Sequence, residues 1–113
     1  MKLIKAYVRP KIADQVIHAL EKAKPFSIEA ADVKVIGDGV FELEKNPDGQ
    51  VSIEYGAVFF PMTKLEIICH DEEVKRILKV LEEKGRTGRE RDGFISVSRL
   101  AKVIKLHTKK EEK

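Results

Sequence analysis

The residues best suited to chemistry lie in one short segment, residues 86–97, with the sequence RTGRERDGFISV. It holds a Thr-Gly pair, an Asp-Gly pair and three arginines ahead of an apolar run. Glycines let the backbone approach an anion and present N–H groups to it, and a guanidinium can bind a phosphate through two hydrogen bonds. The segment is therefore a candidate phosphate-binding loop. The same residues would also make an ordinary turn between a helix and a strand, and both interpretations stay open on these residues alone.

Cys69 and His70 are candidates for metal binding, because thiolate and imidazole groups bind transition metals. They are neighbours on a predicted strand, where successive side chains point to opposite faces, so they cannot hold one ion together. His18 and His107 are the remaining histidines, so a metal site would require a subunit interface. No spacing of Ser, His, Asp or paired carboxylates in the chain predicts a catalytic site.

Strands and helices alternate along the chain and must position these residues. Alternation of apolar and polar residues predicts strands over 2–9, 27–36, 63–70 and 94–98. Apolar stripes at helical spacing predict amphipathic helices over 12–24 and 72–84.

The ends of these elements carry their own signals. Pro25 is expected to stop the first helix, Asp71 to cap the N-terminus of the second, and Gly85 to end it. Residues 100–108 are predicted to form a short helical turn or a last edge strand. The charged tail, 109–113, is expected to be disordered.

The order β-α-β, long insert, β-α-β is the split βαβ, or ferredoxin-like, arrangement. It predicts an α+β fold, βαββαβ, with an antiparallel sheet and both helices on one face, in a single domain over residues 1–108. The other face of the sheet then needs cover, which an oligomer partner often supplies.

The insert, residues 37–61, is about twice the ordinary length of a connection. Within it, VFELE and QVSIEY flank Asn-Pro-Asp-Gly, a turn sequence, so a hairpin is expected. Long loops of this kind are usually functional or disordered. If this loop is functional, the residues expected to carry its function are Phe41, Leu43, Pro47, Gly49, Val51, Ile53 and Tyr55.

Composition limits the classes of function. The chain has 113 residues, 36% of them charged, and a net charge of +3, which is too small to predict nucleic-acid binding by itself. An RNA-recognition motif of the same fold needs aromatic residues among basic ones on its central strands, and these strands supply only Phe94. No apolar run approaches the ~18 residues of a membrane span, and one cysteine cannot form an internal disulfide. A cytoplasmic protein without a nucleic-acid partner is expected.

In the order and spacing of its motifs, the chain resembles the PII signal-transduction proteins and their PII-like relatives. The resemblance covers nearly the whole chain, through MKLIKAYVRP, ALEKA, ADVKVIG before the long loop, FFP followed by KLEI, RTGRERDGFISV and VIKLHT. It implies a homotrimer of ferredoxin-like protomers with adenine nucleotides in the clefts between subunits. It also implies a T-loop, here 37–55 or so, that docks on transporters, enzymes or regulators. PII-like proteins are not enzymes; they report energy and nitrogen or carbon status.

The resemblance assigns roles to individual residues. The segment matching 87–93 lies against the nucleotide phosphates in the family, and Lys105 and His107 match a basic pair at the end of its last strand. The nucleotide-binding residues that it implies are Gly37, Thr87, Gly88, Arg89, Arg91, Asp92, Gly93, Lys105 and His107. The alternative is that the glycines only make a turn, and that Lys105 and His107 belong to a solvated face.

Four departures from the family's pattern bear on the ligand. Arg91 replaces a glycine, Phe94 and Met62 replace lysines, and Gly39 replaces a glutamine that helps to hold magnesium and 2-oxoglutarate. Arg89 and Arg91 could compensate for the missing cations. The expectation is a divergent PII-like protein with no tightly bound cofactor, which binds ADP, AMP, ATP or another anion as a regulatory ligand without help from 2-oxoglutarate.

Two further alternatives remain open. Tyr55 aligns with a tyrosine that some PII proteins have uridylylated, although its neighbours differ and a place in the hairpin explains it equally. The chain could also be a trimeric metal-responsive or structural module resembling the divalent-cation-tolerance proteins. Stabilisation by an anionic nucleotide would favour the regulator, and a response only to copper or zinc would favour the module.

Overall fold

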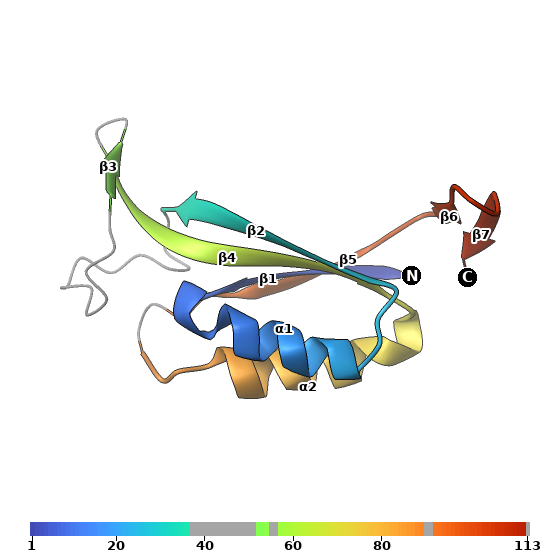
Figure 1. Cartoon of the computed structure of the whole chain (residues 1–113), viewed down its shortest axis with the longest axis horizontal. Coiled ribbons are helices and arrows are strands. Elements are labelled where there is room, and N and C mark those ends of the chain that lie inside the picture. The colour runs from blue at the N-terminus through green and yellow to red at the C-terminus, as the bar shows by residue number, and fades with distance from the viewer. Residues whose placement is uncertain (37–51, 55–56, 90–91, 113) are drawn as a thin grey trace.

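The computed structural model describes residues 1–36, 52–54, 57–89 and 92–112. The elements along the chain are shown in Figure 1. In order, they are β1 (Lys2–Val8), η1 (Pro10–Ile12), α1 (Ala13–Lys22), β2 (Ser27–Val35), β3 (Ser52–Glu54), β4 (Ala57–Cys69), η2 (Asp71–Glu73), α2 (Val74–Gly85), β5 (Ile95–Arg99), β6 (Val103–Lys105) and β7 (Lys110–Glu112).

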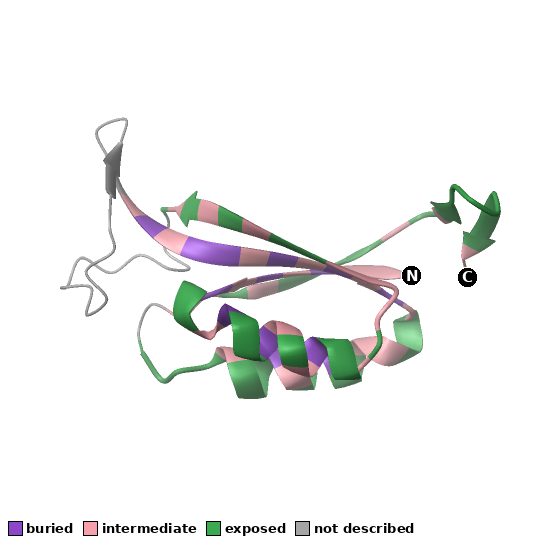
Figure 2. Ribbon diagram, in the orientation of Figure 1, coloured by how far each residue is buried: buried purple, intermediate pink, exposed green. Residues whose placement is uncertain are grey.

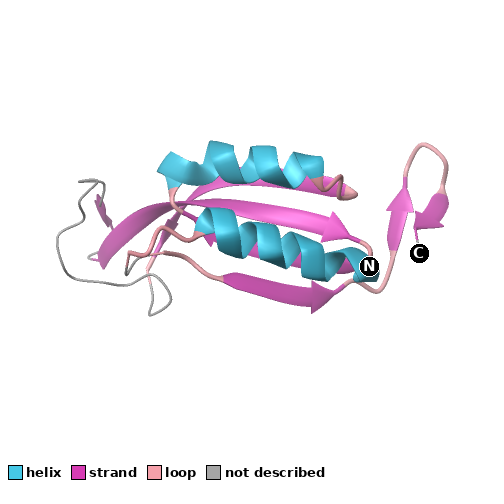
Figure 3. Cartoon of the chain, turned by 90° about the horizontal axis from the view of Figure 1, so that it is seen from below, coloured by secondary structure: helices cyan, strands magenta, loops and turns pink. Residues whose placement is uncertain are grey.

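The main sheet has the strand order β2-β4-β1-β5, and β3 pairs with β4. Each pairing is antiparallel, with Ile4 of β1 opposite Ile67 of β4 and Val97 of β5. Helices α1 and α2 lie side by side on one face of this sheet (Figure 3). The predicted antiparallel α+β arrangement of the ferredoxin-like type is therefore confirmed.

The hydrophobic core lies between the helices and the sheet (Figure 2). Alternate residues of the two central strands point into it and meet the apolar stripes of both helices. The fully buried large side chains are Ile4, Val16, Leu20, Leu65, Ile67, Cys69, Ile77 and Leu81. Full burial of an aliphatic side chain contributes about 1.5–3 kcal/mol, so this layer fixes the register of the sheet.

The opposite face of the sheet carries both apolar and charged side chains. Leu3 and Ile68 are opposite each other in the register of β1 and β4, and both are half-buried. The Glu66 carboxylate lies 3.9 Å from the ammonium groups of both Lys5 and Lys64. No helix of the described residues covers this face (Figure 1).

Strand β4 begins at Ala57, six residues before the predicted start at residue 63. The early residues pair with β2, with Phe60 opposite Val35 and Met62 opposite Val33, and both Phe60 and Met62 are buried. Residues 57–61, expected to belong to the insert, are therefore part of the sheet. Residues 52–54 pair with 57–59, and the rest of the predicted hairpin lies outside the described residues.

The predicted capping role of Asp71 is wrong. The His70 N–H donates to Glu73 Oε1 at 2.8 Å, so the first turn is closed by Glu73. Asp71 instead accepts a hydrogen bond from Lys2 Nζ at 2.9 Å and lies 3.0 Å from the amino group of Met1. The Lys2 ammonium and the Met1 amino group lie within reach of Asp71 because the N-terminal end of β1 is beside the C-terminal end of β4.

The C-terminal residues form a separate two-stranded sheet from β6 and β7. Of the two alternatives for residues 100–108, a strand is found, at Val103–Lys105, although it lies outside the main sheet, and the expected disordered tail was wrong. Ion pairs join the two sides of this hairpin, Lys102 to Glu111 at 3.7 Å and Lys105 to Glu112 at 3.8 Å. The alternating charges that suggested disorder are thus complementary across the hairpin. Among the described residues, no helix combines the length and apolar character that crossing a membrane requires.

Candidate functional site

The loop that follows α2 is organised by one carboxylate, that of Asp92. Its Oδ2 atom accepts hydrogen bonds from the backbone N–H groups of Thr87 at 2.8 Å and Gly88 at 3.0 Å. The Thr87 hydroxyl donates to Oδ1 of the same group. Gly88 has φ +84°, a left-handed conformation that glycine adopts without strain, which turns its N–H toward the carboxylate.

Arg9 joins this loop from the end of β1. Its Nε donates to Asp92 Oδ1 at 3.1 Å, and Arg9 is only 7% exposed. The predicted strand over 2–9 included Arg9, but β1 ends at Val8, so the alternation of a strand does not set the direction of the Arg9 side chain. Arg9 is a site residue that the sequence did not reveal, and its position before Pro10 was the only signal available.

The pKa of Asp92 lies below its ordinary value as the balance of two effects. Burial raises it, but hydrogen bonds from the side chain and backbone of Thr87, from Arg9 and from Gly88 lower it by more. Asp92 is therefore ionised at neutral pH. Because it already binds the N–H groups of Thr87 and Gly88, the backbone nest expected to bind phosphate holds the chain's own carboxylate.

Gly93 is required by packing against β1. A Cβ atom at this position would lie 1.7 Å from the Tyr7 carbonyl oxygen and 2.9 Å from Met62 Cε. The next residue is held to the same strand, because the Tyr7 N–H donates to the Phe94 carbonyl at 2.9 Å. The loop thus returns to the sheet through a contact that only glycine permits.

Tyr7 and Phe94 form a stacked aromatic pair with ring centroids 4.6 Å apart and an angle of 25° between the rings. Phe94 remains 41% exposed. A cleft of about 300 Å³ beside this pair has aliphatic and polar walls, formed by Val8, Leu81, Glu82, Arg86, Asp92 and Ile95. Phe94 stands at the position where the resemblance led us to expect a lysine, so an aromatic ring takes the place of a cation on this side of the loop.

A second cleft, of about 260 Å³, lies on the side of the loop that faces η1. The residues that line it are Arg9, Lys11, Ile12, Thr87 and Arg89. We call it the basic cleft, because three of the five are cationic. It brings together two segments that are far apart in the sequence, the end of β1 with η1 and the start of the loop after α2.

The structure brings five of the nucleotide-binding candidates into one loop: Thr87, Gly88, Arg89, Asp92 and Gly93. Lys105 and His107 belong to the C-terminal hairpin at the opposite end of the molecule (Figure 1). Within one chain, the loop candidates and the pair Lys105 and His107 therefore do not lie in the same site. Ile53 lies in β3, opposite Val58. Eight candidates lie outside the described residues: Gly37, Phe41, Leu43, Pro47, Gly49, Val51, Tyr55 and Arg91.

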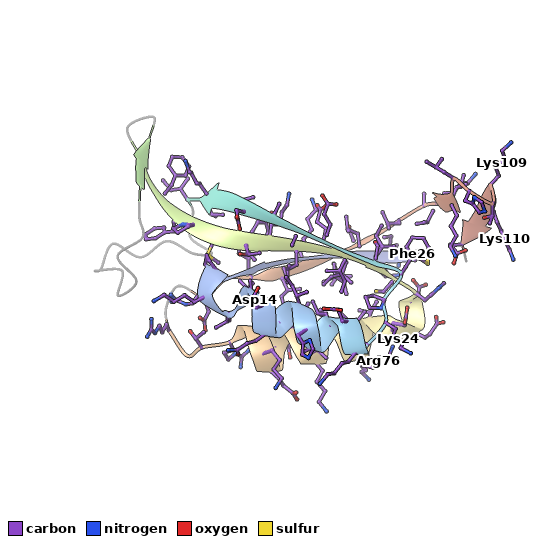
Figure 4. All side chains as sticks on the ribbon, viewed as in Figure 1. Asp14, Lys24, Phe26, Arg76, Lys109 and Lys110 are labelled. Atoms are coloured by element: carbon purple, nitrogen blue, oxygen red, sulfur yellow. The ribbon has the colours of Figure 1, made fainter. Side chains whose placement is uncertain are left out.

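One side chain of the C-terminal hairpin reaches the connection between α1 and β2. Lys105 Nζ is 5.6 Å from the centroid of the Phe26 ring, a cation–π contact. Figure 4 shows Phe26 in this connection, and Arg76 of α2 donates to the Ala23 carbonyl at 2.9 Å beside it. The ammonium of Lys105 is thus held at the surface of the chain, between an aromatic ring and Glu112.

The metal-binding alternative rests on Cys69, which is buried in the core. Burial raises the pKa of its thiol, and the negative charge of Glu73 raises it further. The thiol is therefore protonated at neutral pH, the form that does not bind metal. In the parts of the chain that the structure describes, no three His, Cys, Asp or Glu residues lie close enough together to hold a metal ion.

Comparisons with known proteins agree with this geometry. The family model described as "Nitrogen regulatory protein P-II" matches residues 1–110. A nitrogen regulatory protein P-II of Mesorhizobium japonicum is 31% identical over 110 residues, which cover 96% of this chain and 93% of the relative. A P-II 2 protein of Methanothermobacter thermautotrophicus is 29% identical over 96% of this chain and 90% of its own length. A "nifHD region GlnB-like protein 1" of Methanothermobacter marburgensis is 29% identical over 98% of both chains.

Proposed function

Because the chain belongs to the family of nitrogen regulatory proteins P-II, we propose that it is a signal-transduction regulator that senses an adenine nucleotide and controls a partner protein. The match over residues 1–110 carries this proposal, since it includes both the loop after α2 and the segment that holds Lys105 and His107. The ligand is ADP, AMP or ATP, and the protein acts through what it binds rather than as an enzyme.

The nucleotide site is formed between the subunits of a homotrimer. One subunit contributes the loop held by Asp92, and its neighbour contributes Lys105 and His107. Two observations support this arrangement: the two groups lie at opposite ends of one chain, and no helix of the described residues covers the second face of the sheet.

Partner control acts through the long connection that begins at residue 37 and leads into β4. A membrane transporter or a metabolic enzyme is the class of partner proposed, because regulators of this family are expected to act on such proteins. Nucleic acid is not a partner in this proposal.

Thermal unfolding and calorimetry with ADP, AMP, ATP and GTP test the proposal. A ligand present at 100 times its dissociation constant stabilises the folded state by about 2.7 kcal/mol, which gives a clear shift in melting temperature. We expect an adenine nucleotide to produce such a shift, and Lys105→Gln with His107→Asn to remove it. The matched control is Lys109→Gln with Lys110→Gln in the same hairpin. Absence of a shift with every nucleotide would overturn the proposal.

A further inference from the structure

We propose that a cleft between α1 and the edge strand β2 binds an organic cation, an ammonium or guanidinium group carried on a short aliphatic chain. The cleft has a volume of about 340 Å³. We call it the acidic cleft, and it is lined by Pro10, Ala13, Asp14, Ile17, Ala30, Ala31, Asp32 and Thr63. It shares no lining residue with the two clefts beside the loop after α2.

Two carboxylates give the cleft its charge. Asp14 lies in the first turn of α1 (Figure 4) and Asp32 lies in β2, whereas no cationic residue lines the cleft. Neither carboxylate makes a hydrogen bond or an ion pair with another residue in the ranges that the structure describes. The positive end of the α1 dipole compensates part of the charge of Asp14. A negative charge is therefore left for a ligand to neutralise.

A buried hydroxyl group indicates separately that the cleft accepts a polar ligand. Thr63 is 6% exposed and stands opposite Asp32 in the register of β2 and β4, so both side chains lie on the same face of the sheet. No hydrogen bond joins the Thr63 side chain to another described residue, although among those residues every fully enclosed side-chain oxygen has a partner. The Thr63 hydroxyl is therefore open to the cleft, where it can accept a hydrogen bond from an N–H group of the ligand.

The remaining walls are apolar and favour an organic cation over a metal ion. Small side chains at Ala13 and Ala30 leave room beside Ile17, and an alkyl chain in this space would bury apolar surface. The volume is at the lower end of the range of about 300–1,000 Å³ that is usual for pockets that bind small molecules. Within the described ranges, no three His, Cys, Asp or Glu residues lie close enough together to hold a metal ion.

Titration of the full chain with 1,4-diaminobutane, followed by amide NMR, tests the acidic cleft. We expect saturable shifts at Asp14, Asp32 and Thr63, and a dissociation constant weakened about tenfold or more in Asp14→Asn with Asp32→Asn. The charge-matched control is Glu21→Gln with Glu83→Gln, two exposed carboxylates of the helices that do not line the cleft, and it should leave the dissociation constant unchanged. The neutral probe 1-butanol should shift none of the three amides.

Two further variants separate shape from charge. Ala30→Leu fills the cleft without removing a carboxylate, and Thr63→Val removes the hydroxyl while keeping the size of the side chain. Both should weaken binding of the diamine, and equal melting temperatures would show that the variants are folded.

A second arm identifies the source of the cation. Nα-acetyl-lysine methylamide reproduces a lysine side chain of a partner protein, so equal affinity for this probe and the diamine would indicate docking of a protein. Binding of the diamine alone would indicate a free amine. Neither titration contains a nucleotide, so the cleft can be confirmed where the proposed function fails. Unmoved amides at Asp14, Asp32 and Thr63, or equal weakening in the control pair, would overturn the site.

Discussion

At the scale of single residues, Asp92 has the largest set of contacts in the candidate site. It links β1 to the loop after α2 through Arg9, and it closes the loop through Thr87 and Gly88. Removing one partner of a mostly buried ion pair leaves the other charge without compensation. The loop is therefore sensitive to the charge state of this single group.

We expect Asp92→Asn to lower the free energy of unfolding by about 1–3 kcal/mol at pH 7, because charge-assisted hydrogen bonds of this kind contribute amounts of that order. Urea unfolding of the variant and the parent measures the difference. Asp14→Asn is the control, since Asp14 is an exposed carboxylate in the first turn of α1.

The same variant should change the response to acid. The pKa of Asp92 is lower in the folded state than its ordinary value of 3.8, so the unfolded chain takes up a proton first as the pH falls. The stability that Asp92 supplies is present above that ordinary value and is lost as the pH falls through the folded pKa. Asp92→Asn should flatten the loss of stability below about pH 4; a curve identical to that of the parent protein would contradict this.

Two glycines in this loop should lose stability for different reasons when changed to alanine, and Gly93 should lose more. Gly93→Ala places a Cβ atom 1.7 Å from the Tyr7 carbonyl oxygen, so the backbone must move, at a cost of about 1–3 kcal/mol or more. Gly88→Ala meets no atom within 4 Å and costs only about 1–2 kcal/mol from its positive φ. Melting temperatures of the two variants decide this, and a larger loss at Gly88 would contradict the packing argument.

At the scale of elements, the periodic pattern of apolar residues predicted the strands and helices whose formation depends on local interactions. The strands and helices around the core were recovered because Ile4, Leu65 and Ile77 follow the periods of their elements. The early start of β4 was missed because Phe60 and Met62 are buried by pairing with β2, a long-range contact. The C-terminal hairpin was missed because its lysines and glutamates resemble a solvated tail until they are opposite one another.

In the candidate site too, features set by residues close in sequence were predicted, and features set by long-range contacts were not. Thr87, Gly88 and Asp92 are close in sequence, and the motif that contains them was recognised from sequence. The contact of Arg9 with Asp92 joins positions 83 residues apart, and no local pattern reports it. The hydrogen bonds from the Thr87 and Gly88 N–H groups to Asp92 also depend on side-chain geometry, which cannot be read from the spacing of a motif.

Deletion of residues 41–54 tests the role of the long connection. The pairing of β2 with β4 continues from Ser27–Ile68 to Val35–Phe60 without β3, so we expect the deleted chain to remain folded. We also expect it to lose its partner. Melting temperature and co-purification of the partner should be measured on the same variant; an unfolded variant would make the loop part of the scaffold, and retained capture would place recognition elsewhere.

At the scale of the whole molecule, the second face of the sheet is the surface through which we propose that subunits assemble. Leu3 and Ile68 lie opposite each other on this face, and both are half-buried. We expect a trimer by light scattering and a smaller species for Ile68→Glu, since a buried charge without a partner is costly. Lys79→Glu on the outer face of α2 is the control. A parent protein that stays monomeric at all concentrations would contradict the prediction.

The ligand response also belongs to the assembled protein. Gly39 and Met62 stand where the family has an amide and an ammonium group, and Met62 is buried in the sheet. We therefore expect 2-oxoglutarate and magnesium not to strengthen nucleotide binding. Calorimetry of ATP with and without both additives checks this, and strong synergy would contradict it.

The position of β1 in the sheet has a consequence for how the protein is made. β1 leaves the ribosome well before its two neighbours, β4 and β5, which are encoded far downstream of it. At synthesis rates of roughly 5–20 residues per second, the strand waits several seconds before Ile95 of β5 exists to pair with it. During that time its apolar face and its unpaired backbone edges are exposed to other nascent chains. Productive folding should therefore begin only after β5 has been synthesised, and chaperones that bind extended apolar segments should capture β1 before that point.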